Sequence, residues 1–137
     1  ERLGIPRYQL ARAALERAVG ILRDAGDFSG EIVRAEAAKC ATLCEAARTA
    51  IYAIVQKRAD GLAVGPEASS ARFATVMAER AVCEFIVEYV PEALAGGSAY
   101  LQMHHQRGIV AGIASGAAEI QLNLIATEFL RLPRELG

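Results

Sequence analysis

The sequence has no tryptophan and few other aromatic residues, which limits the kinds of core it can form. Only 6% of its 137 residues are aromatic, although 53% are hydrophobic. The apolar content is therefore mainly Ala, Leu, Ile and Val, which suits closely packed helices. Strand-like alternation of any length is also lacking. The composition predicts one all-α domain, because a chain of this length can bury a single core.

An excess of charge and a long apolar run are also missing. The formal net charge is −1, so the chain has no electrostatic footprint for nucleic acid. No apolar run is long enough to span a bilayer, and no secretory signal is visible. The mean hydropathy is nevertheless high, at +0.24, which indicates a large interface with another domain or subunit. We therefore expect a cytoplasmic protein with a protein partner and with neither nucleic acid nor membrane as a partner.

Cysteines are few and odd in number: Cys40, Cys44 and Cys83. Without a secretory signal, this indicates reduced thiols in a cytoplasm-like compartment. Cys40 and Cys44 are four residues apart and share a helix face, so a metal site that also uses Cys83 and a histidine is conceivable. The commoner role of such cysteines is that of small buried side chains. We therefore expect no metal.

Helical spacing of apolar residues divides most of the chain into segments with short connections. The first is expected to begin at Pro6, a good first residue of a helix, and to end near Ala25. Ser29 is expected to cap the second, which ends at Asp60-Gly61. The third is expected to begin around residues 65–67 and to end between residues 91 and 98. Its polar face is expected to carry Arg72, Glu79, Arg80, Glu84 and Glu88, and its apolar face Phe73, Met77, Ala81 and Phe85.

The last third of the chain is predicted to contain one irregular stretch and one long helix. Residues 99–106 are interpreted as irregular, with His104 and His105 in a loop. In residues 107–134, Ser115 is predicted to cap a helix that ends at Leu132-Pro133. The free amides at such a helix start favour an anion. Four helices with short connections predict an antiparallel, up-and-down four-helix bundle.

Several motifs resemble those of one known family, the acyl-CoA dehydrogenases, in their C-terminal domain. The closing segment of that family opens with Gly-Thr-x-Glu-Ile-Gln and ends with Leu-Gly-Leu-Pro-Arg, and the family also carries Gly-Gly-x-Gly-Tyr and Leu-x-x-Glu-Arg runs. The matching residues here are Gly116 with Glu119-Ile120-Gln121, Leu130-Arg131-Leu132-Pro133-Arg134, Gly96-Gly97-Ser98-Ala99-Tyr100 and Leu15-Glu16-Arg17. Residues 67–73 resemble its Ala-Ser-x-x-Lys run, with Arg72 in place of Lys.

The resemblance covers nearly the whole chain but only one domain of the family. It implies that residues 1–137 are the C-terminal helical bundle, and that the N-terminal helical domain and the middle strand domain are absent. It also implies FAD as cofactor, an acyl-CoA as substrate and a dimer of dimers. In the family, a carboxylate removes the α-proton while the β-hydride passes to the flavin, which forms a 2,3-enoyl-CoA. This chain alone is expected to be inactive.

The resemblance implies one candidate for the catalytic base, Glu16. Many members carry the base as a Glu just before the Gly of Gly-Thr, where this chain has Ser115, and the Thr position is Ala117. A minority carry it at the Glu of Glu-Arg in the first helix, which Glu16 matches. The alternative is that Glu16 is a solvated residue paired with Arg12, four residues earlier.

The resemblance also implies four cofactor-binding residues. Gly96 and Gly97 match a turn that meets the FAD pyrophosphate of a neighbouring subunit, and glycines expose amides to phosphate. The alternative for them is an ordinary helix stop. Gly116 and Gln121 match cofactor-side positions at the start of the last helix, and the alternative for Gln121 is an exposed amide.

Three functions therefore stay open. The first is the catalytic bundle of an acyl-CoA dehydrogenase, with Glu16 as base. The second is a non-catalytic subunit of a mixed tetramer, such as those acting on steroid side-chain CoA thioesters, which the replacements Ser115, Ala117 and Ala99 favour. The third is a helical oligomerisation module, which the matched motifs disfavour. The sequence defines neither the acyl chain nor whether the partner subunit is identical.

Overall fold

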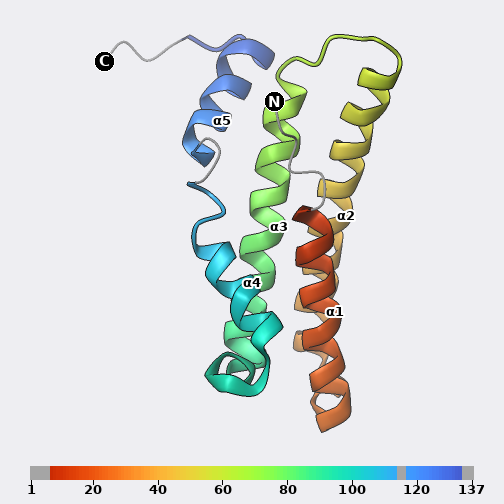
Figure 1. Ribbon diagram of the computed structural model, residues 1–137, viewed down its shortest axis with the longest axis vertical. Helices are drawn as coiled ribbons and strands as arrows, with labels where there is room; N and C mark the ends of the chain where they lie inside the picture. Colours follow the sequence, from red (N-terminus) through yellow and green to blue (C-terminus); the bar gives the residue numbers. More distant parts are fainter. Residues whose placement is uncertain (1–6, 114–116, 134–137) are drawn as a thin grey trace.

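The computed structural model describes residues 7–113 and 117–133. The helices α1 (Arg7–Ala25), α2 (Glu31–Ala59) and α3 (Glu67–Tyr89) run alternately down and up the bundle (Figure 1). The shorter helices α4 (Ala99–Ile109) and α5 (Ala118–Leu124) follow one another along the fourth position. No strand occurs in these ranges. The predicted all-α, up-and-down four-helix bundle is therefore confirmed, with its fourth member divided in two.

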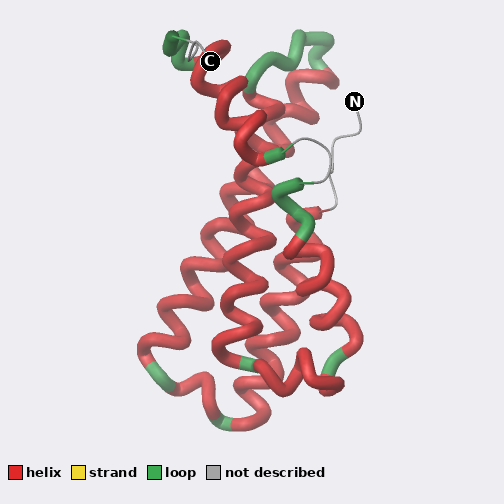
Figure 2. The backbone as a smooth tube through the Cα atoms, turned by 90° about the vertical axis from the view of Figure 1, so that its left-hand side faces the viewer, coloured by secondary structure: helices red, strands yellow, loops and turns green. Residues whose placement is uncertain are grey.

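The described residues also form three short turns of helix: η1 (Asp27–Ser29), η2 (Ala93–Gly97) and η3 (Ile125–Phe129). Seen from the side, the helices run roughly along the length of the molecule, and most of the connections lie at its two ends (Figure 2). Helix α3 contacts α1, α2, α4 and α5. It is therefore the central element of the bundle. Within the described ranges, no helix combines the length and the apolar character needed to cross a membrane.

The core is built largely from small side chains, as the composition predicted. Ala11, Ala14 and Ala18 of α1 are completely buried, and so are Ala47 of α2 and Ala78 of α3. Small residues at these positions let helix backbones approach one another closely. Larger side chains fill the space between them, and Ile54, Ile86 and Leu101 are the largest of those that are fully buried.

The predicted cap of the second helix is wrong. Ser29 belongs to the tight turn η1, and Gly30 is the N-cap of α2 without a side-chain hydrogen bond. Its end at Asp60-Gly61 is confirmed.

The interpretation of residues 99–106 as irregular is also wrong, because they form most of α4. Ser98 caps this helix, and its Oγ accepts a hydrogen bond from the Leu101 amide. The buried positions are Leu101, His104 and Gly108. Only one of them is a large apolar residue, so the helical period of α4 is hidden in the sequence.

The helix of residues 107–134 is shorter than predicted. Helix α5 begins at Ala118, after Ala117, which makes no side-chain cap, and the last turn η3 ends at Phe129, before Leu132-Pro133. The predicted cap Ser115 and its neighbour Gly116 lie outside the described residues. A backbone hydrogen bond outside the helix holds the start of α5: the Ala118 N–H donates to the Gly112 carbonyl at 2.8 Å.

The two predicted faces of the third helix are only partly confirmed. Arg80, Glu84 and Glu88 are exposed as expected, and Phe85 is buried. Glu79, expected on the polar face, is 3% exposed, whereas Met77 is exposed. The reason is that α3 contacts other helices on several sides, so an amphipathic pattern with one polar face does not describe it.

The three cysteines are buried, as predicted. Burial raises the pKa of each thiol to about 11. The described residues contain no group of three potential metal ligands. At neutral pH the thiols are therefore protonated and act as small apolar side chains.

His104 is buried rather than placed in a loop. It is 4% exposed, and its Nε2 has no hydrogen-bond partner among the described residues. Burial, and then the charges of Arg107 and His105, lower its pKa from 6.5 to about 4. The folded chain therefore holds this imidazole neutral at pH values where the unfolded chain protonates it.

We predict that His104 makes the free energy of unfolding depend on pH. Because its folded pKa is depressed, its contribution is fully present above about pH 6.5 and is lost as pH falls towards 4. The loss is on the order of 3 kcal/mol, since one pKa unit corresponds to about 1.4 kcal/mol. Urea unfolding of the wild type and of His104→Leu at several pH values measures it. The variant should lose less stability on acidification, and equal slopes would contradict the prediction.

Candidate functional site

Glu16 lies on an exposed face of α1, at the edge facing α2. Its side chain is 66% exposed, and its Oε1 accepts from Arg12 Nε at 3.0 Å. Arg12 also pairs with Glu45 of α2, which accepts from Arg48 Nε at 2.7 Å. The hydrogen bond to Glu16, and then the charge of Glu45, raise the pKa of Arg12. The predicted pairing with Arg12 is therefore present, within a row of four alternating charges.

A groove runs between α1 and α2 beside this row, and we call it the α1–α2 groove. Its volume is about 590 Å³. Near the α1–α2 turn, Arg23 lies over the ring of Phe28, 5.1 Å from its centroid. The groove thus joins an apolar floor to a charged rim that includes Glu16. Its lining residues are Arg12, Leu15, Glu16, Val19, Arg23, Phe28, Arg34, Ala37, Ala38, Ala41, Cys44 and Glu45.

The turn at Gly96-Gly97 needs glycine for backbone reasons. Gly96 has φ +115°, a conformation that other residues rarely adopt. A Cβ at Gly97 would lie 2.9 Å from the Glu92 carbonyl oxygen, which is too close. On Gly96, in contrast, a Cβ would meet no atom within 4 Å. The turn is therefore a helix stop whose backbone is open to an outside group at Gly96.

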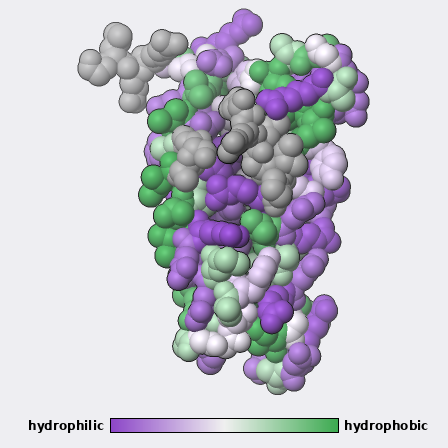
Figure 3. Space-filling view, in the orientation of Figure 1, coloured by the Kyte–Doolittle hydropathy of each residue, from purple (hydrophilic) through white to green (hydrophobic). Residues whose placement is uncertain are grey.

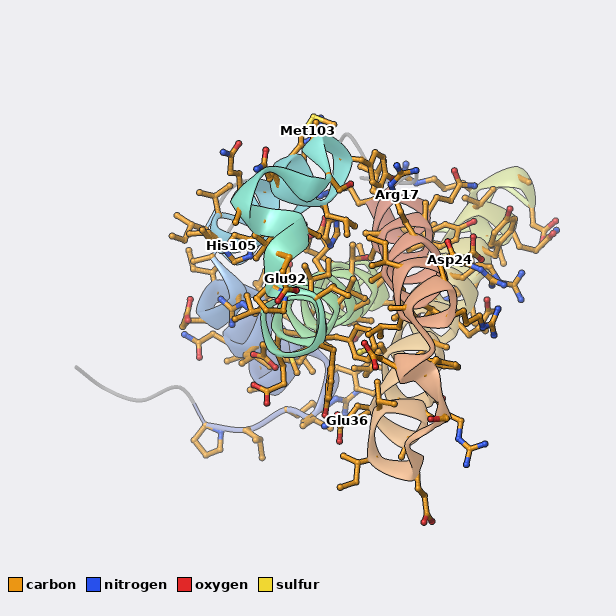
Figure 4. All side chains as sticks on the ribbon, turned by 90° about the horizontal axis from the view of Figure 1, so that it is seen from below. Arg17, Asp24, Glu36, Glu92, Met103 and His105 are labelled. Carbon is orange, nitrogen blue, oxygen red and sulfur yellow. The ribbon has the colours of Figure 1, made fainter. Side chains whose placement is uncertain are left out.

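An unpredicted contact connects this turn to the first helix. Arg17 Nε donates to Ser98 Oγ at 3.2 Å, and Ser98 is buried as the cap of α4. In Figure 4, Arg17 lies between the ribbons of α1 and α4. Each residue belongs to a run that matched the family, but 81 positions separate them. Sequence analysis missed the contact because nothing local indicates that the two runs meet.

The structure does not bring Glu16 to the same place. Successive residues of an α-helix point about 100° apart, so Glu16 faces the α1–α2 groove whereas Arg17 reaches the cap of α4. Gln121 is half-buried on α5, and its backbone N–H donates to the Ala117 carbonyl at 3.1 Å. Gly116 lies outside the described residues. The candidate residues that the structure describes thus occupy separate parts of the bundle.

Comparison with known proteins identifies the family. The family profile described as acyl-CoA dehydrogenase, C-terminal domain, matches residues 1–130. The chain therefore belongs to the acyl-CoA dehydrogenases, a family of oxidoreductases, and its all-α bundle is the C-terminal domain. No curated protein matches the chain.

A solved structure shares this fold. It is a variant of the Tcur3481-Tcur3483 steroid ACAD, with a TM-score of 0.76 and 22% sequence identity. The match covers 94% of this chain and 38% of that chain. The chain thus spans less than half the length of this solved protein, and the similarity shows the fold alone.

We predict that Ser98 stabilises the junction of α1, the turn and α4. Ser98→Ala removes the cap of α4 and the acceptor of Arg17, so the free energy of unfolding should fall by about 1 kcal/mol. Ser29→Ala is the matched control, because Ser29 caps no helix. Urea unfolding compares the two. A loss as large in Ser29→Ala as in Ser98→Ala would contradict this role.

Proposed function

We propose that this chain is the C-terminal bundle of an FAD-dependent acyl-CoA dehydrogenase and works within a larger assembly. The observation that supports this most is the family match over residues 1–130. The structural match to a solved ACAD, which covers 94% of this chain, adds to it. The activity belongs to the whole assembly, because the chain spans 38% of that solved relative. The cytoplasm is the compartment we propose.

The reaction we propose is the oxidation of an acyl-CoA to a 2,3-enoyl-CoA. FAD, when bound, supplies the acceptor for the β-hydride. The protein must supply a base for the α-proton and hold the acyl group where that base reaches it. It must also keep water away, since a carboxylate is a weak base in water and a stronger one when desolvated.

Glu16 is the base that we propose. It stands on the rim of a groove with an apolar floor, which suits an acyl group beside a carboxylate. In the chain alone it is exposed and paired with Arg12. A covering domain or subunit that excludes water from the α1–α2 groove would supply the missing desolvation. Arg12 would then remain paired with Glu45, so Glu16 can be released without leaving a cation unpaired.

Gly96, Gly97, Gly116 and Gln121 are the cofactor-side residues that we propose. The turn fits a pyrophosphate, because at Gly96 the space that a side chain would fill is open. Backbone amides exposed in this way bind phosphate oxygens. This agrees with FAD bound by a neighbouring subunit, and hence with a dimer of dimers. Exposed apolar residues in the last third of the chain, Ile109, Ile113, Ile120 and Phe129 among them, are available for such contacts. Figure 3 shows hydrophobic surface, in green, along the left side of the molecule, where α4 and α5 lie.

The role of Glu16 predicts a large loss of activity on removing its charge. In the full assembly, Glu16→Gln should lower kcat by about 100-fold or more, because the proton has no acceptor. Asp24→Asn is the matched control, since Asp24 is an exposed carboxylate on the same helix and does not line the groove. It should keep most of the activity. Wild-type turnover by Glu16→Gln would refute Glu16 as base.

A second candidate function is a non-catalytic subunit of a mixed tetramer. The 66% exposure of Glu16 and its pairing with Arg12 favour it, because a carboxylate held by a cation in water is poorly suited to proton abstraction. In that case the base lies in the partner chain.

Subunit composition separates the two functions. We expect native mass spectrometry and flavin absorbance of the purified full-length protein to show a homo-oligomer with one FAD per chain. A mixed oligomer in which this chain binds no FAD by itself would instead identify it as the non-catalytic half.

A further inference from the structure

The turn between α3 and α4 has an exposed tip that stands between two buried anchors. Ala95, Gly96 and Gly97 form the tip and are exposed, whereas Ala93 before them and Ser98 after them are 4% and 5% exposed. The Ser98 N–H donates to the Ala93 carbonyl at 2.9 Å and closes the turn. The shape of the tip therefore depends on how its two ends are held.

A glutamine side chain of α4 holds the end of the tip that leads in from α3. Gln102 Nε2 donates to the Leu94 carbonyl, eight residues earlier, at 2.8 Å. In an α-helix the partner of that carbonyl would be the N–H four residues on, which belongs to Ser98. That N–H bonds to the Ala93 carbonyl instead. The side chain of Gln102 thus takes the place of a missing backbone donor.

An arginine side chain of α1 holds the other end of the tip. Arg17 Nε donates to Ser98 Oγ at 3.2 Å, and the same oxygen accepts from the Leu101 amide at 3.4 Å. A hydroxyl oxygen has two lone pairs and can accept both bonds. Ser98 is therefore held by its own helix and by α1 at once. The two ends of the tip are fixed by side chains that come from different helices.

The tip needs such support because its own residues restrict it very little. Glycine has more backbone freedom than any other residue, and two glycines in succession allow an unsupported chain many shapes. In the observed shape Gly96 has φ +115° with open space beside it, and Gly97 lies close to the Glu92 carbonyl. Fixing one shape before a ligand arrives lowers the entropy cost of binding.

We propose that Gln102 and Arg17 are positioning residues: they hold the two ends of the tip so that Gly96 stays open to a pyrophosphate. This rests on the proposed function for the ligand, which is FAD. The support of the tip itself depends only on contacts within this chain. Gln102 lies outside every run that resembles the family, so its role comes from the hydrogen bond to Leu94 alone.

Hydrogen exchange and FAD affinity of the full-length assembly test the role of Gln102. Gln102→Met removes the donor and keeps the length, so amides of residues 95–98 should exchange about fivefold faster, as for the loss of one hydrogen bond. The Kd for FAD should rise by about the same factor. Gln102→Glu, which also lacks the donor at neutral pH, should do the same. Gln106→Met is the matched control, an exposed glutamine of the same helix, and should change neither measurement. An unchanged Kd in both Gln102 variants, or equal acceleration throughout α2, would overturn the proposal.

A double-mutant cycle tests whether Arg17 acts through Ser98. Arg17→Met should raise the Kd for FAD in the wild-type background and have no further effect in Ser98→Ala, because the acceptor is already gone. An equal effect in both backgrounds would mean that Arg17 contacts the cofactor directly, which would overturn its positioning role. If the wild-type assembly holds no FAD, the proposed function fails and the tip loses its proposed ligand. The exchange comparison then still decides whether Gln102 and Arg17 hold the tip.

Discussion

Close approach of helix backbones at small residues is the constraint on which the rest of this structure depends. Alanines of α1, α2 and α3 are completely buried, and Gly108 of α4 lies where any side chain would overlap Cys83. Helices at such short separation bury few large side chains, so stability comes from many small contacts. The absence of tryptophan and the high alanine content follow from this packing rather than from the chemistry of a site.

The same packing explains why polar side chains of α3 are buried or half-buried. This helix contacts α1, α2, α4 and α5, so side chains that would be solvated on an outer helix are enclosed here. Glu79 and Arg72 pair with groups on other elements, Arg7 and the carbonyl of Ala111, which offsets the cost of burying them. The candidate base stands elsewhere. Glu16 lies on an outer face, where only another domain or subunit can remove its water.

Much of the fold was predictable because three helices repeat apolar residues at helical spacing and glycine or proline lies between them. Helix α4 was not predictable in this way, since Leu101, His104 and Gly108 include a single large apolar residue. The pairing of Glu16 with Arg12 was foreseen from their spacing of four. The contact of Arg17 with Ser98 was not, because it joins residues 81 positions apart.

The sequence by itself determined the class of fold, the family and the runs that carry the resemblance, because these depend on local periodicity and on order along the chain. Only the tertiary structure decided which side of each helix faces inward. It buried Glu79, which the pattern placed on a polar face, and it directed Arg17 and Glu16 to different neighbours. The physical reason is that burial depends on how many elements surround a helix, and a linear pattern does not record that number.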